Sequence, residues 1–258
     1  MALSQLPASV IVYIVSSILP AIIAFVILIV VSRGRATNLW LVPGWLAAAA
    51  IGPVLATFFG VRLLISTFSA MATSGGGIGA VSAGMWEAMQ PSLFAGYVAG
   101  ALALFTVIIA IRSMINADTD TPTTGSATST IISVVILIVA VLAVAACANL
   151  FQHLVGFITD VIDPHAPPMG EGIASVSQKL ANELTRAAFV AAGSLLLLIA
   201  AVVITAVMDP KAQPSQSFGI FLTFVTVLCV IGLVVNVISI SAWSTRLQNT
   251  AITGQVQR

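Results

Sequence analysis

One acidic side chain stands alone in an apolar stretch of this sequence, and it is the first candidate for chemistry. Glu87 is the only charged residue between Arg62 and Arg112. Because a carboxylate is costly to place in a bilayer, an ionisable group at such a position marks a functional site by default. Glu87 could carry protons, dock a partner or lie exposed to interfacial water. Arg62 lies at a similar predicted depth, so it is a further candidate for the ion pathway, and we expect it to form a locking ion pair with Glu87.

Hydroxyl and imidazole groups supply the other candidates for an ion pathway. Thr57 and Ser92 lie in the same two apolar stretches, where a hydroxyl usually donates to the backbone carbonyl four residues earlier. Pro91 lacks the N–H that would bond to the carbonyl of Glu87, so we expect the helix to loosen beside this carboxylate. His153 could act as a proton relay near neutral pH, or it could be an ordinary interfacial histidine.

Two rows of small residues, spaced four apart, surround these polar groups. One row runs through Gly84, Ala88, Ser92, Gly96 and Gly100, and the other through Gly52, Ala56 and Gly60. On a helix this spacing places small side chains on one stripe, which lets transmembrane helices pack backbone against backbone. We therefore expect both rows to be helix-packing surfaces. We also expect Ala88, Ser92, Gly96 and Gly100 to form a surface for assembly with other subunits.

The elements that position these residues must be membrane helices. The chain has 258 residues, of which 59% are hydrophobic and 7% are charged, and its mean hydropathy is +1.14. This composition excludes a soluble domain and predicts an all-α, polytopic transmembrane helix bundle. A net charge of +1 with scattered Lys and Arg offers no surface for nucleic acid. The sequence has no nucleotide-binding loop, nucleophile elbow or metal-ligand cluster, so we expect no enzyme activity, no metal and no cofactor.

A bilayer-length window predicts about six membrane spans. They lie near 9–32, 41–69, 83–112, 129–155, 186–208 and 217–243. Arg33 and Arg35 follow the first span and no Lys or Arg precedes it, so the positive-inside rule places the N-terminus outside. Trp45 falls near the start of the second span, where we expect it to be an interfacial anchor.

The connecting segments divide the chain into two membrane units. We expect a three-helix unit at 1–115, a flexible linker at 116–128 and a second three-helix unit at 129–258, which includes an outer cap at 156–186. Residues 75–82, GGGIGAVS, and 170–177, GEGIASVS, echo each other 95 positions apart. The echo suggests two related helical hairpins.

Part of the first unit resembles a known family. Residues 83–96, AGMWEAMQPSLFAG, are similar to the third transmembrane helix of the MotA/TolQ/ExbB proton-channel family. Residues 52–68, GPVLATFFGVRLLISTF, resemble the helix that precedes it, and the resemblance covers residues 50–112. It places the pore-lining hydroxyl positions of the family near Gly60, which has no hydroxyl, and at Ser92.

This resemblance implies an integral membrane subunit of a proton-channel or motor-stator-like complex, located in the bacterial inner membrane and working as a homo-oligomer. It also implies a single-span partner subunit that bears an Asp, since no predicted span of this chain holds a deep Asp. Two other functions stay open, namely a non-catalytic scaffold subunit of a larger membrane complex and a small-solute transporter. The lipid bilayer is a partner in every case.

Overall fold

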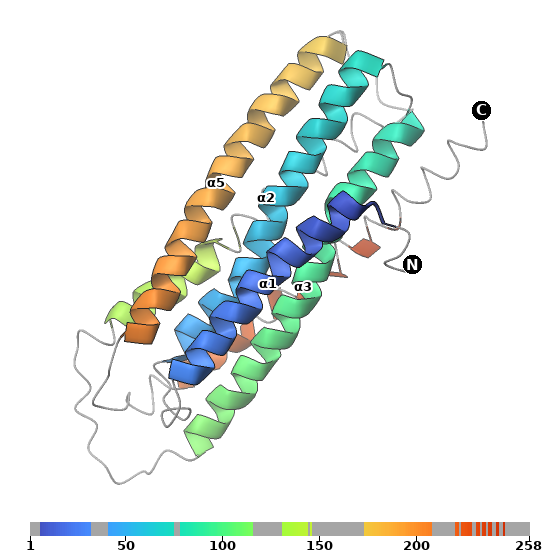
Figure 1. The fold of residues 1–258 in the computed structure, drawn as a ribbon. Helices are drawn as coiled ribbons and strands as arrows, with labels where there is room; N and C mark the ends of the chain where they lie inside the picture. Colours follow the sequence, from blue (N-terminus) through green and yellow to red (C-terminus); the bar gives the residue numbers. More distant parts are fainter. Residues whose placement is uncertain are drawn as a thin grey trace.

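The regular structure of the chain is helical wherever it is described. The computed structural model describes residues 6–31, 41–74, 78–115, 131–143, 145 and 173–207, with short stretches between 220 and 245. The long helices are α1 (Ala8–Val31), α2 (Val42–Ser74), α3 (Ile78–Ile115) and α5 (Ile173–Val207) (Figure 1). A shorter apolar helix, Ile131–Ala143, lies between α3 and α5 in the sequence. The predicted linker at 116–128, the cap before residue 173 and the relay candidate His153 lie outside the described residues.

Four helices are long and apolar enough to cross a membrane. Each of α1, α2, α3 and α5 contains such a span, at Ala8–Val31, Val42–Thr67, Ala83–Arg112 and Leu184–Val207. The chain is therefore an integral, multi-pass membrane protein, as its composition predicts, and the described part has helices and no strands. The predicted spans at 129–155 and 217–243 overlap the shorter helix and the helical stretches between 220 and 245, but neither is long enough in the described residues to count as a span, so the number six stays a prediction.

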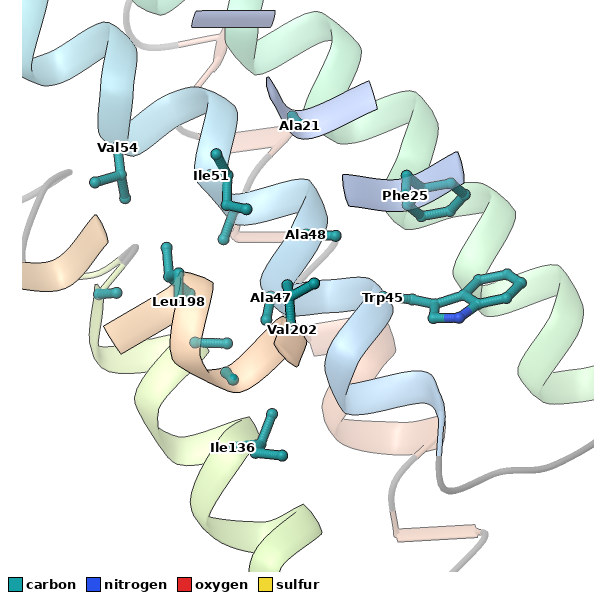
Figure 2. Packing of buried hydrophobic residues seen from close by; sticks show 14 of the residues in the cluster. Ala21, Phe25, Trp45, Ala47, Ala48, Ile51, Val54, Ile136, Leu198 and Val202 are labelled. Atoms are coloured by element: carbon teal, nitrogen blue, oxygen red, sulfur yellow. The ribbon is translucent and has the colours of Figure 1, made fainter. Parts of the chain in front are cut away.

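Helix α2 is the centre of the bundle. It contacts α1, α3 and α5, and 61% of its membrane span is buried, against 28–33% for the other three spans. Every residue from 41 to 52 is buried. This stretch includes four consecutive alanines, 47–50, and small side chains let neighbouring helices approach from every side. Figure 2 shows Leu198 and Val202 of α5 packed beside this part of α2.

The three helices that contact α2 all run antiparallel to it. Gly60 faces Ala88 of α3, whereas Gly84 at the start of α3 meets Thr67 near the end of α2. Gly44 at the start of α2 meets Thr205 at the end of α5. In α1, Tyr13 stacks on Phe59 of α2, and Ala21, eight residues further on, lies beside Gly52. These contacts fix which residues of neighbouring helices share a level in the bundle.

Three helices are longer than a bilayer needs, and the excess lies at one end. Helices of 33, 38 and 35 residues (α2, α3 and α5) are about 50, 57 and 53 Å long at 1.5 Å per residue, against a hydrocarbon core of about 30 Å. The residues beyond their membrane spans are mainly 68–74, 78–82 and 173–183. All three segments lie where α2 ends and α3 begins, which we call the hairpin end.

The second predicted hairpin repeats a feature of the first. Helices α3 and α5 begin at Ile78 and Ile173, which are equivalent positions in the echo 95 residues apart. The buried residues of α5 are Leu184, Ala187, Ala191, Ser194, Leu198, Ala201, Val202 and Thr205. When 95 is subtracted from each of these eight residue numbers, seven of the resulting positions are buried residues of α3, and the exception is the position that corresponds to Val202. The two helices therefore bury the same face relative to their glycine-rich starts.

Candidate functional site

The seam between α2 and α3 brings two backbones into near contact. A Cβ atom added to Gly60 would lie 2.8 Å from the carbonyl oxygen of Ala88 and 3.8 Å from Oγ of Ser92. Gly60 therefore points a Cα–H group at the Ala88 carbonyl, which is a recurring weak contact at close helix interfaces. The side chain of Ser92 lies in the same seam, beside the space that a larger residue at position 60 would fill.

Ser92 carries a buried hydroxyl without a hydrogen-bond partner. Its side chain is 5% exposed, and its Oγ neither donates nor accepts a hydrogen bond. Thr57 behaves as expected, because its hydroxyl donates to the carbonyl of Pro53 at 2.8 Å. A buried polar group left unpaired costs about 1–3 kcal/mol. Ser92 is therefore the polar group of the seam that is available to a ligand.

The two candidate hydroxyl groups, those of Thr57 and Ser92, lie at the same level of the bundle. Gly60 lies opposite Ala88 and Ser92, and Thr57 is about one turn of α2 further from the hairpin end. Because α2 and α3 are antiparallel, Thr57 is level with Ser92. Thr57 is 5% exposed and its oxygen keeps acceptor capacity after donating to Pro53. Two buried hydroxyls therefore lie at one level of the bundle, with Ser92 in the seam and Thr57 on α2.

Arg62 and Glu87 share a level but not a face, which corrects the expected ion pair. Arg62 follows Gly60 by two residues, so it points about 200° away from the α3 contact, whereas Glu87 immediately precedes Ala88. Arg62 is exposed and Glu87 is partly exposed. In the part of the chain that the structure describes, no ion pair joins them. The shared level of Arg62 and Glu87 follows from their similar distances along the chain from the start of the α2–α3 hairpin. The direction in which each side chain points depends on how α2 and α3 are rotated about their own axes.

The row of small residues on α3 touches different neighbours along its length. A Cβ on Gly84 would overlap the side chain of Thr67, and one on Gly96 would lie 2.6 Å from Cγ2 of Val237. Nothing lies within 4 Å of such an atom on Gly100. A spacing of four residues advances about 400° around a helix, so the row winds by about 40° at each step. The row therefore contacts α2 at Gly84, contacts a C-terminal helical stretch at Gly96 and lies on an open face at Gly100.

The corresponding row on α2 is covered within the chain. Gly52 lies where three helices meet, since an added Cβ would be 3.5 Å from Cβ of Ala21 in α1 and 3.8 Å from Cβ of Ala95 in α3. Ala56 is fully buried. Both rows contribute mainly to packing inside one copy of the chain, and Gly100 is the position whose added Cβ would meet nothing.

Trp45 was predicted to be an interfacial anchor, and the structure places it in the core instead. Its side chain is 3% exposed. Its ring stacks on Phe105 of α3 with centroids 6.1 Å apart, and lies 5.1 Å from Phe25 of α1. Its Nε1 has no hydrogen-bond partner. The position near the start of α2 is as expected, but α1 and α3 both cover it, which the sequence does not reveal.

Neither a metal centre nor a match to a known protein adds to this site. Within the described ranges, no group of three or more His, Cys, Asp or Glu residues could hold a metal ion. Comparisons with protein-family models, with curated proteins and with solved structures find no match to this chain.

Proposed function

We propose that this protein is an integral membrane subunit of a proton-channel or motor-stator-like complex. In this proposal the chain has six spans with its N-terminus outside, lies in a bacterial inner membrane and works as a homo-oligomer. The observation that carries the proposal is the unpaired, buried hydroxyl of Ser92 in the α2–α3 seam. The resemblance of residues 50–112 to the MotA/TolQ/ExbB family supports it.

A proton pathway needs groups that can both donate and accept, and Ser92 can do both. Its hydroxyl offers one donor and two acceptor lone pairs, none of which is used. Thr57 adds a second hydroxyl at the same level. Glu87 lies five residues nearer the hairpin end, about 7.5 Å along the helix axis, and is partly exposed. A water molecule would have to connect Glu87 to Ser92.

A deep acidic group would have to come from another subunit. No Asp lies in the described membrane spans, and the Glu nearest to the seam is Glu87. A single-span partner with one membrane-embedded Asp would supply the missing carrier.

Proton flux into vesicles tests the proposal directly. The complex as purified, with its copurifying partners, is reconstituted and proton entry is followed with a pH-sensitive dye. Ser92→Ala and Glu87→Gln should each reduce flux by at least about tenfold, because each removes a proton-carrying group. Ser17→Ala is the matched control, since Ser17 is also fully buried but its hydroxyl already donates to the carbonyl of Ile14 at 2.8 Å. Equal flux in the Ser92→Ala and Ser17→Ala proteins would refute the proposed pathway.

A non-catalytic scaffold subunit is the second candidate. It is favoured by the packing role of Gly52, Gly60 and Gly84, each of which lies close to a neighbouring helix. A scaffold would copurify with its partners in a fixed ratio and would give no proton flux above that of empty vesicles. Wild-type flux at the level of empty vesicles, with the complex intact, would favour this role.

A further inference from the structure

Arg62 is a charged residue within a membrane span that the proposed pathway does not use. It lies in the apolar span Val42–Thr67, five residues before its end, which is about 8 Å along the helix. Its side chain is exposed, and it forms no ion pair within the described part of the chain. A long Arg side chain at this depth can extend its guanidinium group to the membrane surface. An anion from outside the chain would balance this charge.

The neighbours of Arg62 place it beside α1. Phe59 precedes it by three residues and stacks on Tyr13 of α1, with centroids 5.0 Å apart and an interplanar angle of 15°. Residues three apart on a helix point about 60° apart, so Arg62 lies next to the contact with α1. Its exposed side chain turns away from α3, as the position of Gly60 shows.

The face of α1 next to Arg62 carries hydroxyl groups. Ser9, Tyr13 and Ser16 follow the spacing of residues on one helix face, and the stack of Tyr13 on Phe59 shows that this face adjoins α2. Ser9 is exposed, while Tyr13 and Ser16 are partly buried. On α2, Ser66 is exposed one turn beyond Arg62 and donates to the carbonyl of Leu63, which leaves its oxygen able to accept. One cation and several hydroxyls therefore share an edge of two otherwise apolar helices.

We propose that this edge is a binding site for an anionic phospholipid of the phosphatidylglycerol type. Arg62 holds the phosphate, and the hydroxyls of Ser9 and Tyr13 bind the remaining oxygens of the headgroup. The lipid is anionic because a zwitterionic headgroup brings its own cation, whereas among the described residues no carboxylate balances the charge of Arg62. Phe58 and Leu55, four and seven residues before Arg62, are partly buried on the same face of α2 and give an acyl chain an apolar path. This inference is independent of the proposed proton pathway.

Lipid retention by the full chain tests the site. The protein is incubated in mixed micelles with equal amounts of phosphatidylglycerol and phosphatidylcholine, and the bound lipids are counted by native mass spectrometry. Arg62→Gln should lower the ratio of bound phosphatidylglycerol to phosphatidylcholine by about fivefold, which corresponds to about 1 kcal/mol per basic side chain near an anionic lipid. Arg62→Lys should keep part of the preference, because the charge stays but the two-pronged contact with phosphate is lost.

Two further variants separate a built site from general attraction to lipid. Arg112→Gln removes an exposed arginine at the opposite end of a span and should change the ratio by less than about twofold, because a single contact between exposed charges contributes little. The double variant Ser9→Ala with Tyr13→Phe keeps Arg62 and should lower the ratio by about two- to threefold. An unchanged ratio in Arg62→Gln would overturn the site, and so would an equal loss in Arg112→Gln. If Arg62→Gln does not fold, an unchanged ratio in the double variant would overturn it.

Discussion

A single methyl group added at Gly60 should destabilise the protein, and the same methyl group at Gly100 should not. In Gly60→Ala the new Cβ would lie 2.8 Å from the carbonyl oxygen of Ala88, whereas close C···O contacts between helices are about 3.3–3.6 Å. The missing half ångström or more must come from separating α2 and α3, because the obstacle is backbone and cannot rotate away. At Gly100 nothing lies within 4 Å of the added atom.

The pair of variants isolates the packing term. Replacing a helical Gly by Ala gains up to about 1 kcal/mol from helix propensity at both sites, so this gain cancels in the comparison. Overpacking typically costs about 1–3 kcal/mol. For a chain of this size, about 1 kcal/mol shifts the midpoint of thermal unfolding by roughly 2–4 °C. We therefore expect Gly60→Ala to unfold about 6 °C below Gly100→Ala.

The assay is thermal unfolding in one mild detergent, followed by the loss of the monodisperse peak in size-exclusion chromatography. Both variants and the wild-type protein are heated at the same rate and concentration. Equal midpoints for Gly60→Ala and Gly100→Ala would refute the close approach of α2 and α3 at this point. A midpoint of Gly60→Ala above that of the wild-type protein would refute it as well.

Three other measurements check separate features of the fold. Trp45→Phe removes the unpaired Nε1 but keeps an aromatic ring in the cluster, so this variant should unfold within about 3 °C of the wild-type protein. Trp45→Ala removes the ring as well and should lower the free energy of unfolding by about 3–5 kcal/mol. Similar losses of stability in the two variants would show that the indole nitrogen has a partner. Arg62→Ala and Glu87→Ala should have additive effects on the unfolding midpoint, because their side chains form no ion pair, and a double variant more stable than the sum of the two would restore the pair. With the N-terminus outside, a cysteine at Ser126 should resist an impermeant thiol reagent in intact cells and one at Ser175 should react, whereas the reverse labelling would invert the topology.

The class of fold follows from the sequence because it depends on local properties. Hydropathy and helix length identify the four long spans, since each is a property of consecutive residues. The levels of Arg62 and Glu87 also follow, because both lie at similar distances from the glycine-rich turn at 75–77. Even the winding of the small-residue row on α3 could have been predicted, since it follows from the helical repeat alone.

What the sequence cannot supply is the rotation of each helix against its neighbours. Arg62 and Glu87 point to different faces because α2 presents Gly60 to α3. Trp45 is buried because Phe25 and Phe105, from two other helices, reach its level. These contacts join residues far apart in the chain, so no local pattern marks them.

The candidate site shows the same division between local and non-local information. The hydrogen bond of Thr57 to Pro53 is local and follows from a general preference of hydroxyls in helices. The same preference fails at Ser92, whose hydroxyl is unpaired in the seam. The position of Ser92 depends on how α3 packs against α2, which no local sequence pattern specifies.

The excess length of α2, α3 and α5 has a mechanical consequence for the seam. Helix α3 runs without a break from Ile78, at the hairpin end, through Ala88 and Ser92. Pro91 is the point of α3 where a bend is easiest, and closely packed interfaces switch between discrete arrangements rather than deform smoothly. Because Gly60 and Ala88 leave no slack between the two backbones, a pull or tilt applied to the hairpin end would be felt at Ser92. Force applied beyond the membrane surface would therefore act on the spacing between α2 and α3 at the level of Ser92.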